Sequence, residues 1–298
     1  EVGNMVDFYK WYMATGLSEW MLNNPGDPFS DDDNLQLTTL GIEKGVIEWF
    51  APFYGIKKED VWGFVTCSGT DGNNHGIYYG SNILKQKTGL MPIVYVSKEA
   101  HYSSRRLCDV QNLEVRLIGS DKWGRMDPED LRKQLDPSRP ALIILAIGST
   151  FMGAIDDQDA IQKVLDEVKP IAYFRHIDGA LFGGYLPFSE HKDIVDMSLR
   201  HYDSIAVSGH KFFGLDEPCG LFITRKDVLQ AQKAYKVEYL NSAMPTISCS
   251  RSALSPLKYY FMINTVGAEG LKEQAKTILE RTEYFQGELD RISWPAWH

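Results

Sequence analysis

Apolar runs of strand length alternate with longer stretches of helical periodicity along most of this 298-residue chain. The run ALIILAIGS at 141–149 is almost continuously apolar, which is typical of a strand buried on both faces of a sheet. The stretch at 160–168 has the apolar spacing of a helix. Strands that alternate with helices predict an α/β domain whose mainly parallel sheet is covered on both faces.

The pattern predicts seven strands, at residues 61–66, 92–97, 113–119, 141–149, 171–178, 203–209 and 220–225. After the first strand, the small and polar residues 67–74 are expected to form a turn, and a helix is expected to follow from His75. Further helices are predicted at 126–135, with Asp127 as N-cap and Pro128 in the first turn, and at 160–168 and 265–292.

These elements divide the chain into three parts. We assign residues 1–45 to an N-terminal segment, residues 46–264 to a large domain and residues 265–298 to the start of a smaller C-terminal domain. The chain begins at Glu1 and stops without an obvious end, so we expect the first and the last of these parts to be incomplete.

The composition limits the classes of molecule that we expect this protein to bind. The net charge of −9 argues against binding to nucleic acid or acidic membranes, because both need basic patches. No apolar run approaches the roughly 20 residues of a membrane span. The four cysteines stand singly, without a C-x-x-C pair, so we expect no metal site and reduced thiols in a cytoplasmic protein.

Chemically active residues follow the ends of several predicted strands, which is where α/β sheets bind ligands. Lys211 lies behind a histidine in SGHKFFG, and a lysine amine can form a Schiff base with an aldehyde. Pyridoxal phosphate is the cofactor that uses such a lysine, and it also needs an acidic partner at its pyridine nitrogen. Asp178 in HIDGA is the candidate partner, although a lone aspartate at a strand end is more often a cap.

The other parts of such a site are also present. The stretch SGTDGN (68–73) offers the Thr70 hydroxyl and backbone N–H groups that lead into a helix, whose N-terminus favours an anion. Ser208 and His210 can add two donors to a phosphate, and His101 in AHYS can stack on a pyridine ring. Each signal is weak alone, but together they predict one site that binds pyridoxal phosphate.

The set SGTDGN, AHYS, IGSTFMGAIDD, HIDGA and SGHK resembles the pyridoxal-phosphate-dependent group II amino-acid decarboxylases of fold type I, the aspartate aminotransferase-like fold. It is most similar to the branch of histidine decarboxylases and plant serine decarboxylases, from about residue 23 to residue 251. The resemblance implies a mixed, mainly parallel sheet of seven strands in the large, cofactor-binding domain. It also implies a smaller C-terminal domain, truncated here, and a homodimer with active sites at the subunit interface.

The resemblance also implies a role for each matching residue. Lys211 forms the Schiff base with the cofactor, Asp178 pairs with the pyridine nitrogen, and His101 stacks on the ring. Ala180 is expected on the opposite face of the ring, and Thr150 near the ring hydroxyl or the substrate carboxylate. The residues expected around the phosphate are Gly69, Thr70, Ser208 and His210, with Ser250 reaching the phosphate of the neighbouring subunit.

The chain departs from the family pattern at three places. Asp71 stands where the family often has a glutamate, so the carboxylate at this position is carried on a side chain one methylene shorter. Gly179 replaces the first alanine of Asp-Ala-Ala, and Cys249 replaces the glycine of Gly-Ser-Arg. None of these changes removes a chemical role.

The resemblance implies decarboxylation of an L-amino acid, with histidine as the leading substrate and His101 or Tyr239 as candidate proton donor. An aminotransferase or lyase of the same fold would share Lys211 and Asp178. An aminotransferase usually holds the substrate carboxylate with an arginine, for which Arg251 is the residue to examine. An inactive structural homologue is a further possibility, against which the full set of cofactor residues argues.

Overall fold

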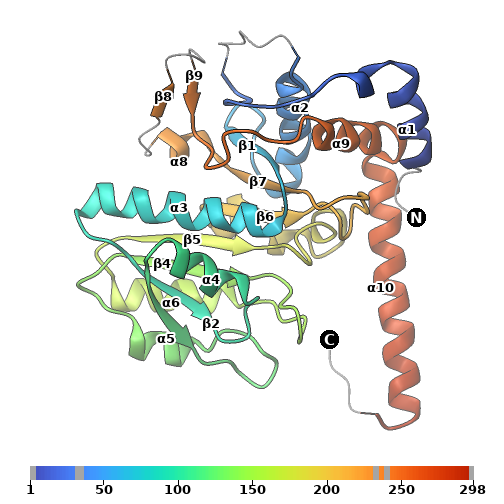
Figure 1. Ribbon diagram of the computed structural model, residues 1–298. Coiled ribbons are helices and arrows are strands. Elements are labelled where there is room, and N and C mark those ends of the chain that lie inside the picture. The colour runs from blue at the N-terminus through green and yellow to red at the C-terminus, as the bar shows by residue number, and fades with distance from the viewer. Residues whose placement is uncertain (1–4, 31–36, 231–234, 238–241, 295–298) are drawn as a thin grey trace.

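A sheet of seven strands lies at the centre of the molecule, with helices on both faces (Figure 1). The computed structural model describes residues 5–30, 37–230, 235–237 and 242–294. Across the sheet the strands are β1 (Val61–Thr66), β7 (Gly220–Arg225), β6 (Ser204–Ser208), β5 (Tyr173–Asp178), β4 (Ala141–Ala146), β2 (Ile93–Ser97) and β3 (Glu114–Ile118). Strands β2 to β6 run parallel, and β7 is antiparallel to both β1 and β6. The expected mixed, mainly parallel sheet is confirmed.

Helices connect the strands and extend the chain at both ends. They are α1 (Met5–Ala14), α2 (Leu40–Phe50), α3 (Gly69–Thr88), α4 (Ser103–Val110), α5 (Pro128–Gln134), α6 (Gln158–Val168), α7 (Met197–Arg200), α8 (Lys226–Gln230), α9 (Leu254–Thr265) and α10 (Gly267–Arg291). Short 3₁₀ helices lie at 17–19, 51–54, 186–188 and 192–194. A hairpin of β8 (Tyr235–Val237) and β9 (Ser242–Met244) stands apart from the large sheet.

Alternate residues of the central strands contribute to separate cores, because side chains of a strand point to opposite faces in turn. On one face, Val94, Leu142 and Phe174 pack with apolar residues of α3 and α4. On the other face, Tyr95 and Ile143 belong to the larger core, which includes residues of α2, α5 and α6. Both faces are buried, which explains why β4 lacks the polar alternation of a half-exposed strand.

Helix α3 lies directly on the sheet because glycines form the side that it turns toward the strands. Gly72, Gly76 and Gly80 recur every four residues and therefore share one face of the helix. A Cβ atom at Gly72 would lie 2.7 Å from the Cβ of Ala206, and one at Gly76 would meet the ring of His176. This close approach brings the start of α3 next to the ends of β5 and β6.

All seven predicted strands are present, within two residues of the expected bounds except at one end. Strand β4 stops at Ala146 rather than at residue 149. The chain turns there, with Gly148 at φ +91°, and Ile147 then pairs with Ile155 in an isolated bridge. The predicted cap of α5 is confirmed, since the Asp127 side chain accepts a hydrogen bond from the next turn.

The prediction of a turn at 67–74 is wrong for most of that stretch. Helix α3 begins at Gly69 rather than at His75. Ser68 is its N-cap, and the Ser68 hydroxyl oxygen accepts a hydrogen bond from the backbone N–H of Asp71 (3.2 Å). Four glycines and several polar residues gave this helix a loop-like composition, and the packing of its glycine face against the sheet outweighs their low helix propensity.

The C-terminal part consists of α9 and α10, which meet at Gly267 with φ +64°. The long helix predicted at 265–292 is confirmed as α10. Its buried residues, Leu271 and Ala275, lie in its first turns, and its second half extends away from the sheet (Figure 1). The division of the chain at residues 45 and 264 stays a prediction. Across the described ranges, no helix combines the length and apolar character needed to cross a membrane.

Candidate active site

A cavity of about 240 Å³ lies beyond the carboxyl ends of the parallel strands. Residues that follow β1, β2, β4, β5 and β6 contribute to its lining. Nine of the ten residues predicted to bind the cofactor line it: Gly69, Thr70, His101, Thr150, Asp178, Ala180, Ser208, His210 and Lys211. The fold therefore brings together groups that lie at widely separated positions of the chain.

Lys211 lies in a loop that folds back on itself after β6. Gly209 donates its backbone N–H to the carbonyl of Cys219 (2.8 Å), and Leu215 donates to the carbonyl of Gly209 (3.2 Å). The Nδ1 atom of His210 lies 3.2 Å from the Cys219 carbonyl oxygen. A Cβ at position 209 would lie 2.7 Å from the sulfur of Cys219, so the fold of this loop requires the glycine.

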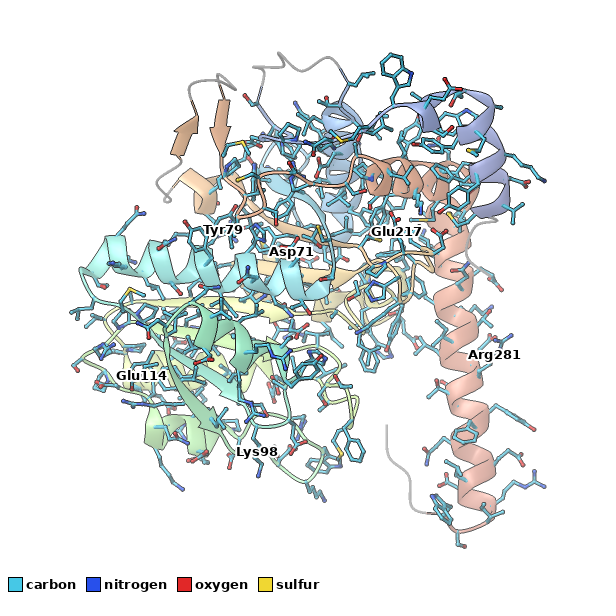
Figure 2. All side chains as sticks on the ribbon, in the orientation of Figure 1. Asp71, Tyr79, Lys98, Glu114, Glu217 and Arg281 are labelled. Carbon is cyan, nitrogen blue, oxygen red and sulfur yellow. The ribbon has the colours of Figure 1, made fainter. Side chains whose placement is uncertain are left out.

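A buried lysine anchors the far end of the same loop. The Lys258 ammonium on α9 lies 2.8 Å from Asp216 and 3.1 Å from Glu217, and it donates to the Tyr9 hydroxyl of α1 (2.7 Å). Burial works to lower the pKa of Lys258, but these hydrogen bonds outweigh it and raise that pKa above its usual value. Figure 2 shows Glu217 close to α9. The loop that carries Lys211 is thus fixed to α9 and α1.

Asp178 ends β5 and is 7% exposed. Its partners on the neighbouring strands are Ala146 and Ala206. One carboxylate oxygen accepts the backbone N–H of Ala180 (3.2 Å), which leaves lone pairs for a further donor. A carboxylate with small residues around it can therefore take a protonated ring nitrogen.

The first turn of α3 forms another wall of the pocket, and two reciprocal hydrogen bonds cap it. The Ser68 hydroxyl accepts from the Asp71 N–H, and the Asp71 carboxylate accepts from the Cys67 N–H (3.0 Å). Burial opposes ionisation of Asp71, but hydrogen bonding to His75 and the N–H of Cys67 lower its pKa below the usual value. Asp71 lies in the first turns of α3 (Figure 2). The shorter side chain thus still makes a capping bond.

The backbone N–H groups of Gly69 and Thr70 have no acceptor among the described residues, so they are free to bind an anion at the start of a 20-residue helix. A Cβ at position 69 would collide with the Ser208 hydroxyl and lie 3.1 Å from the Cβ of Ala180. Glycine is therefore needed for the helix end and the Ser208 loop to approach each other.

These groups fit pyridoxal phosphate. Free N–H groups at a helix N-terminus and the Ser208 hydroxyl suit its phosphate. The Asp178 carboxylate suits its pyridine nitrogen, and the Lys211 amine suits its aldehyde. The requirement for glycine at position 69 also matches a cradle in which backbone approaches the ligand closely.

His101 and Thr150 lie on two further loops. The Nδ1 atom of His101 is 2.7 Å from the Ser103 hydroxyl, and its ring centroid is 4.3 Å from that of Tyr102. Thr150 is exposed in the loop after β4, where the Ser149 hydroxyl accepts the N–H of Ala154 (3.1 Å). Both loops are thus held by local hydrogen bonds at the rim of the pocket.

Ser250 is the one predicted cofactor residue that does not line the pocket of its own chain. It is exposed, and its hydroxyl accepts a hydrogen bond from the side-chain amide of Asn23 (3.3 Å). Tyr239, the second candidate proton donor, lies outside the described residues.

Arg251 is 3% exposed and is not directed at the pocket. Its guanidinium pairs with the buried Glu43 carboxylate and donates to the carbonyl of Gly26 (3.0 Å). Glu43 also accepts from the side chain of Asn24 and from the backbone of Val65, both at 2.8 Å. Removing one partner of a buried ion pair costs about 3–5 kcal/mol, so Arg251 ties the 250–253 segment to the N-terminal part of the chain.

Sequence reasoning assigned no role to four polar residues of the pocket wall, Ser68, Asn73, Ser103 and Ser149. Asn73 stands three residues after Thr70, so both lie on one side of α3. Placing the start of that helix at Gly69 would have revealed it. Ser103 follows His101 by two residues, and apart from that proximity nothing in the sequence marks it as a pocket residue.

Known proteins share this sequence and fold. The family model for the pyridoxal-dependent decarboxylase conserved domain matches residues 81–293, more than half of the chain. Histidine decarboxylase from Solanum lycopersicum is 34% identical over 92% of this chain and 65% of its own length. Serine decarboxylase 1 from Oryza sativa subsp. japonica is 34% identical over 93% and 57%. The crystal structure of L-methionine decarboxylase from Streptomyces sp. 590 has a TM-score of 0.76 at 19% identity, covering 94% of this chain and 73% of that one.

The structural similarity shows the fold, which is fold type I of the pyridoxal phosphate enzymes. The chain spans 57–65% of the length of these two curated relatives. The region matched by the family model includes Lys211, Asp178 and His101, and the pocket that these residues line suits the cofactor of that family. The chain belongs to the family of pyridoxal-dependent decarboxylases.

Proposed function

We propose that the protein decarboxylates an L-amino acid, using pyridoxal 5′-phosphate, to give the amine and carbon dioxide. The observation that supports this activity is a single pocket lined by Lys211, Asp178 and His101 together with the N-terminus of α3. Each group has a use in such a reaction, and the groups come from separate strand ends.

When bound, pyridoxal phosphate supplies an aldehyde that captures an amine and a ring that accepts the electron pair left by departing carbon dioxide. The Gly69 and Thr70 N–H groups and the Ser208 and His210 side chains would hold the phosphate. Asp178 would hold a proton on the pyridine nitrogen, and this positive charge would increase the capacity of the ring to accept electrons.

Lys211 would hold the cofactor through its Nζ atom, since a lysine amine can form a Schiff base with an aldehyde. His101 would contact the cofactor, and because its Nδ1 atom lies beside the Ser103 hydroxyl, its Nε2 atom is left to deliver a proton to Cα. Thr150 orients the substrate carboxylate or the ring hydroxyl. Ala180, which also lines the pocket, would contact the cofactor as well.

Histidine is the first substrate that we propose. Its support is the similarity to proteins named histidine decarboxylase, and serine is second because proteins named serine decarboxylase are equally similar. The pocket lining favours neither substrate. Among the described residues that line it, every acidic or basic side chain already has a role toward the cofactor.

An aminotransferase is the alternative with a testable structural requirement. Such an enzyme holds the substrate carboxylate with an arginine, whereas Arg251 is buried and paired with Glu43. Within the described ranges no arginine lines the pocket. A firmly held carboxylate would also oppose its loss, so the lining favours decarboxylation.

The direct test is to incubate the purified protein and pyridoxal phosphate with single L-amino acids and to measure carbon dioxide and amine. We expect amine from histidine or serine and no keto acid; keto-acid formation without carbon dioxide would contradict the proposal. The Lys211→Ala variant should lose turnover and the visible absorbance of the bound cofactor. Lys163→Ala, which removes an exposed lysine of α6, is the control and should keep both.

We also propose a cytoplasmic homodimer in which Ser250 reaches the phosphate in the pocket of the partner subunit. Ser250 is exposed and lies away from the pocket of its own chain, which supports a role in another subunit. The four cysteines are free thiols, which suits a reducing compartment.

A further inference from the structure

Asn73 is a buried polar residue on the pocket wall that the proposed reaction does not use. It is 2% exposed, and its Oδ1 atom lies 3.0 Å from Nε2 of His176. Its Nδ2 amide group has no hydrogen-bond partner among the residues that the structure describes. Asn73 lines the cavity, so its unpartnered Nδ2 amide is available to an acceptor on a ligand there.

His176 and Ser204 determine which end of the Asn73 amide faces the pocket. Both are fully buried, and the Ser204 hydroxyl lies 2.8 Å from Nδ1 of His176. The Asn73 oxygen, which can only accept, faces Nε2 of His176, so Nδ1 is left to accept from the Ser204 hydroxyl. A neutral imidazole then carries its proton on Nε2 and donates to the oxygen of Asn73, which turns Nδ2 away from His176.

The imidazole stays neutral in this position. Burial lowers the pKa of His176 to about 3, with a hydrogen bond to the backbone of Ser204 as the smaller, opposing influence. The chain of hydrogen bonds from Ser204 through His176 to Asn73 therefore keeps one direction over the physiological pH range. It also crosses three elements, from β6 through β5 to α3.

We propose that Asn73 is a cofactor-binding residue whose Nδ2 amide donates to an acceptor oxygen of bound pyridoxal phosphate. His176 and Ser204 are positioning residues that hold the amide in this orientation. The inference rests on the proposed binding of the cofactor in this pocket. Asn73 follows Thr70 on α3, and His176 precedes Asp178 by two residues on the same face of β5, so the pair joins the phosphate end of the site to the strand of the acid partner.

The test measures the affinity of the apoprotein for pyridoxal phosphate in two matched variants. Asn73→Asp keeps an oxygen for His176 but replaces the donor with a negative charge. Asn74→Asp places the same charge one residue further along α3, where the side chain accepts from Gln111 outside the pocket lining. We expect the first variant to raise the dissociation constant at least tenfold and the second to change it less than about twofold.

Each outcome separates the two proposals. If the unchanged apoprotein does not bind pyridoxal phosphate, the proposed function fails. If it binds and Asn73→Asp binds within twofold of it, the role of Asn73 is wrong while the proposed function stands. Should Asn73→Asp fail to fold by thermal unfolding, Asn73→Ala decides in its place, with an expected loss of about threefold or more.

The orientation has its own readout in the absence of cofactor. The ¹⁵N resonances of the His176 ring, assigned by comparison with a His176→Gln variant, should show the proton on Nε2. In Ser204→Ala this preference should weaken, because the donor to Nδ1 is gone. A proton on Nδ1 in the unchanged protein would overturn the assignment, since Asn73 would then present its oxygen to the pocket.

Discussion

Asp178 is the one acidic side chain on the pocket wall formed by the described residues. Its carboxylate accepts the Ala180 N–H and is largely shielded from water at 7% exposure. Charge interactions are stronger in such a setting than at a surface, so a carboxylate there can hold a proton on an aromatic nitrogen. An amide of the same shape cannot, because it carries no charge.

Replacing Asp178 with asparagine therefore tests charge separately from shape. We expect Asp178→Asn to keep a near-normal cofactor content at saturating pyridoxal phosphate but to release carbon dioxide at least about 100-fold more slowly. Cofactor content is read from absorbance after denaturation in alkali. Asp166→Asn on the exposed face of α6 is the control, since its oxygen can still accept from Gln162. A rate within threefold of the unchanged protein would contradict the role of Asp178.

At the scale of elements, Asp156 fixes the end of β4 and thus the loop that carries Thr150. It is 2% exposed, and its carboxylate accepts the N–H groups of Ala146 (2.7 Å) and Met126 (2.6 Å). Burial raises its pKa to about 6, although both N–H groups work to lower it. The folded protein therefore holds a proton on Asp156 more tightly than the unfolded chain does.

The sign of the resulting pH dependence follows from this difference. A carboxyl with a raised pKa stabilises the fold fully below its unfolded pKa, near 4, and the contribution is lost as the pH rises through about 6. Asparagine does not titrate. The stability difference between the unchanged protein and Asp156→Asn should therefore shrink by about 2–3 kcal/mol between pH 4 and pH 7.

Urea unfolding of both proteins across that range measures the difference. Ser149→Ala serves as the control, because it alters the same loop without removing a carboxyl, and its stability difference should not change with pH in this way. A difference for Asp156→Asn that stays constant, or grows with pH, would show that Asp156 is not protonated preferentially in the folded state.

At the scale of the whole molecule, two large aromatic side chains next in sequence to pocket-lining residues are exposed. Tyr102 and Phe151 are 57% and 89% exposed, and each follows a pocket-lining residue, His101 or Thr150. Exposed apolar groups beside a ligand site suit coverage by another protein surface. Together with the outward position of Ser250, they support the proposed homodimer.

A mixing experiment tests this arrangement. Lys211→Ala and Ser250→Asp should each have low activity, and subunit exchange between them should create heterodimers with one intact site. We expect recovery to about one quarter of the normal specific activity when exchange is random. Mixing Lys211→Ala with Asp178→Asn is the control and should recover nothing, because both residues line the pocket of their own chain. No recovery in the first mixture would contradict a role for Ser250 across the interface.

The seven strands and most of their bounds could be predicted because apolar patterning depends on burial alone, and strands buried on both faces show it strongly. The start of α3 could not be predicted from the sequence. Gly72, Gly76 and Gly80 lower helix propensity locally, and only the nearby sheet explains why a helix needs glycine there. The turn after Ala146 could likewise not be predicted, because the run of apolar residues continues through Ile147.

For the candidate site, too, some features could be predicted from the sequence and others depend on the fold. By itself the sequence determined the chemical types, since a lysine, an acid and a histidine after strand ends limit the cofactor that they can serve. Tertiary structure decided which polar groups are free. It buried Arg251 against Glu43 and away from the pocket, and it left the amide of Asn73 unpaired on the pocket wall. Hydrogen-bond partners come from elements distant in the chain, so only the folded packing shows which donors remain for a ligand.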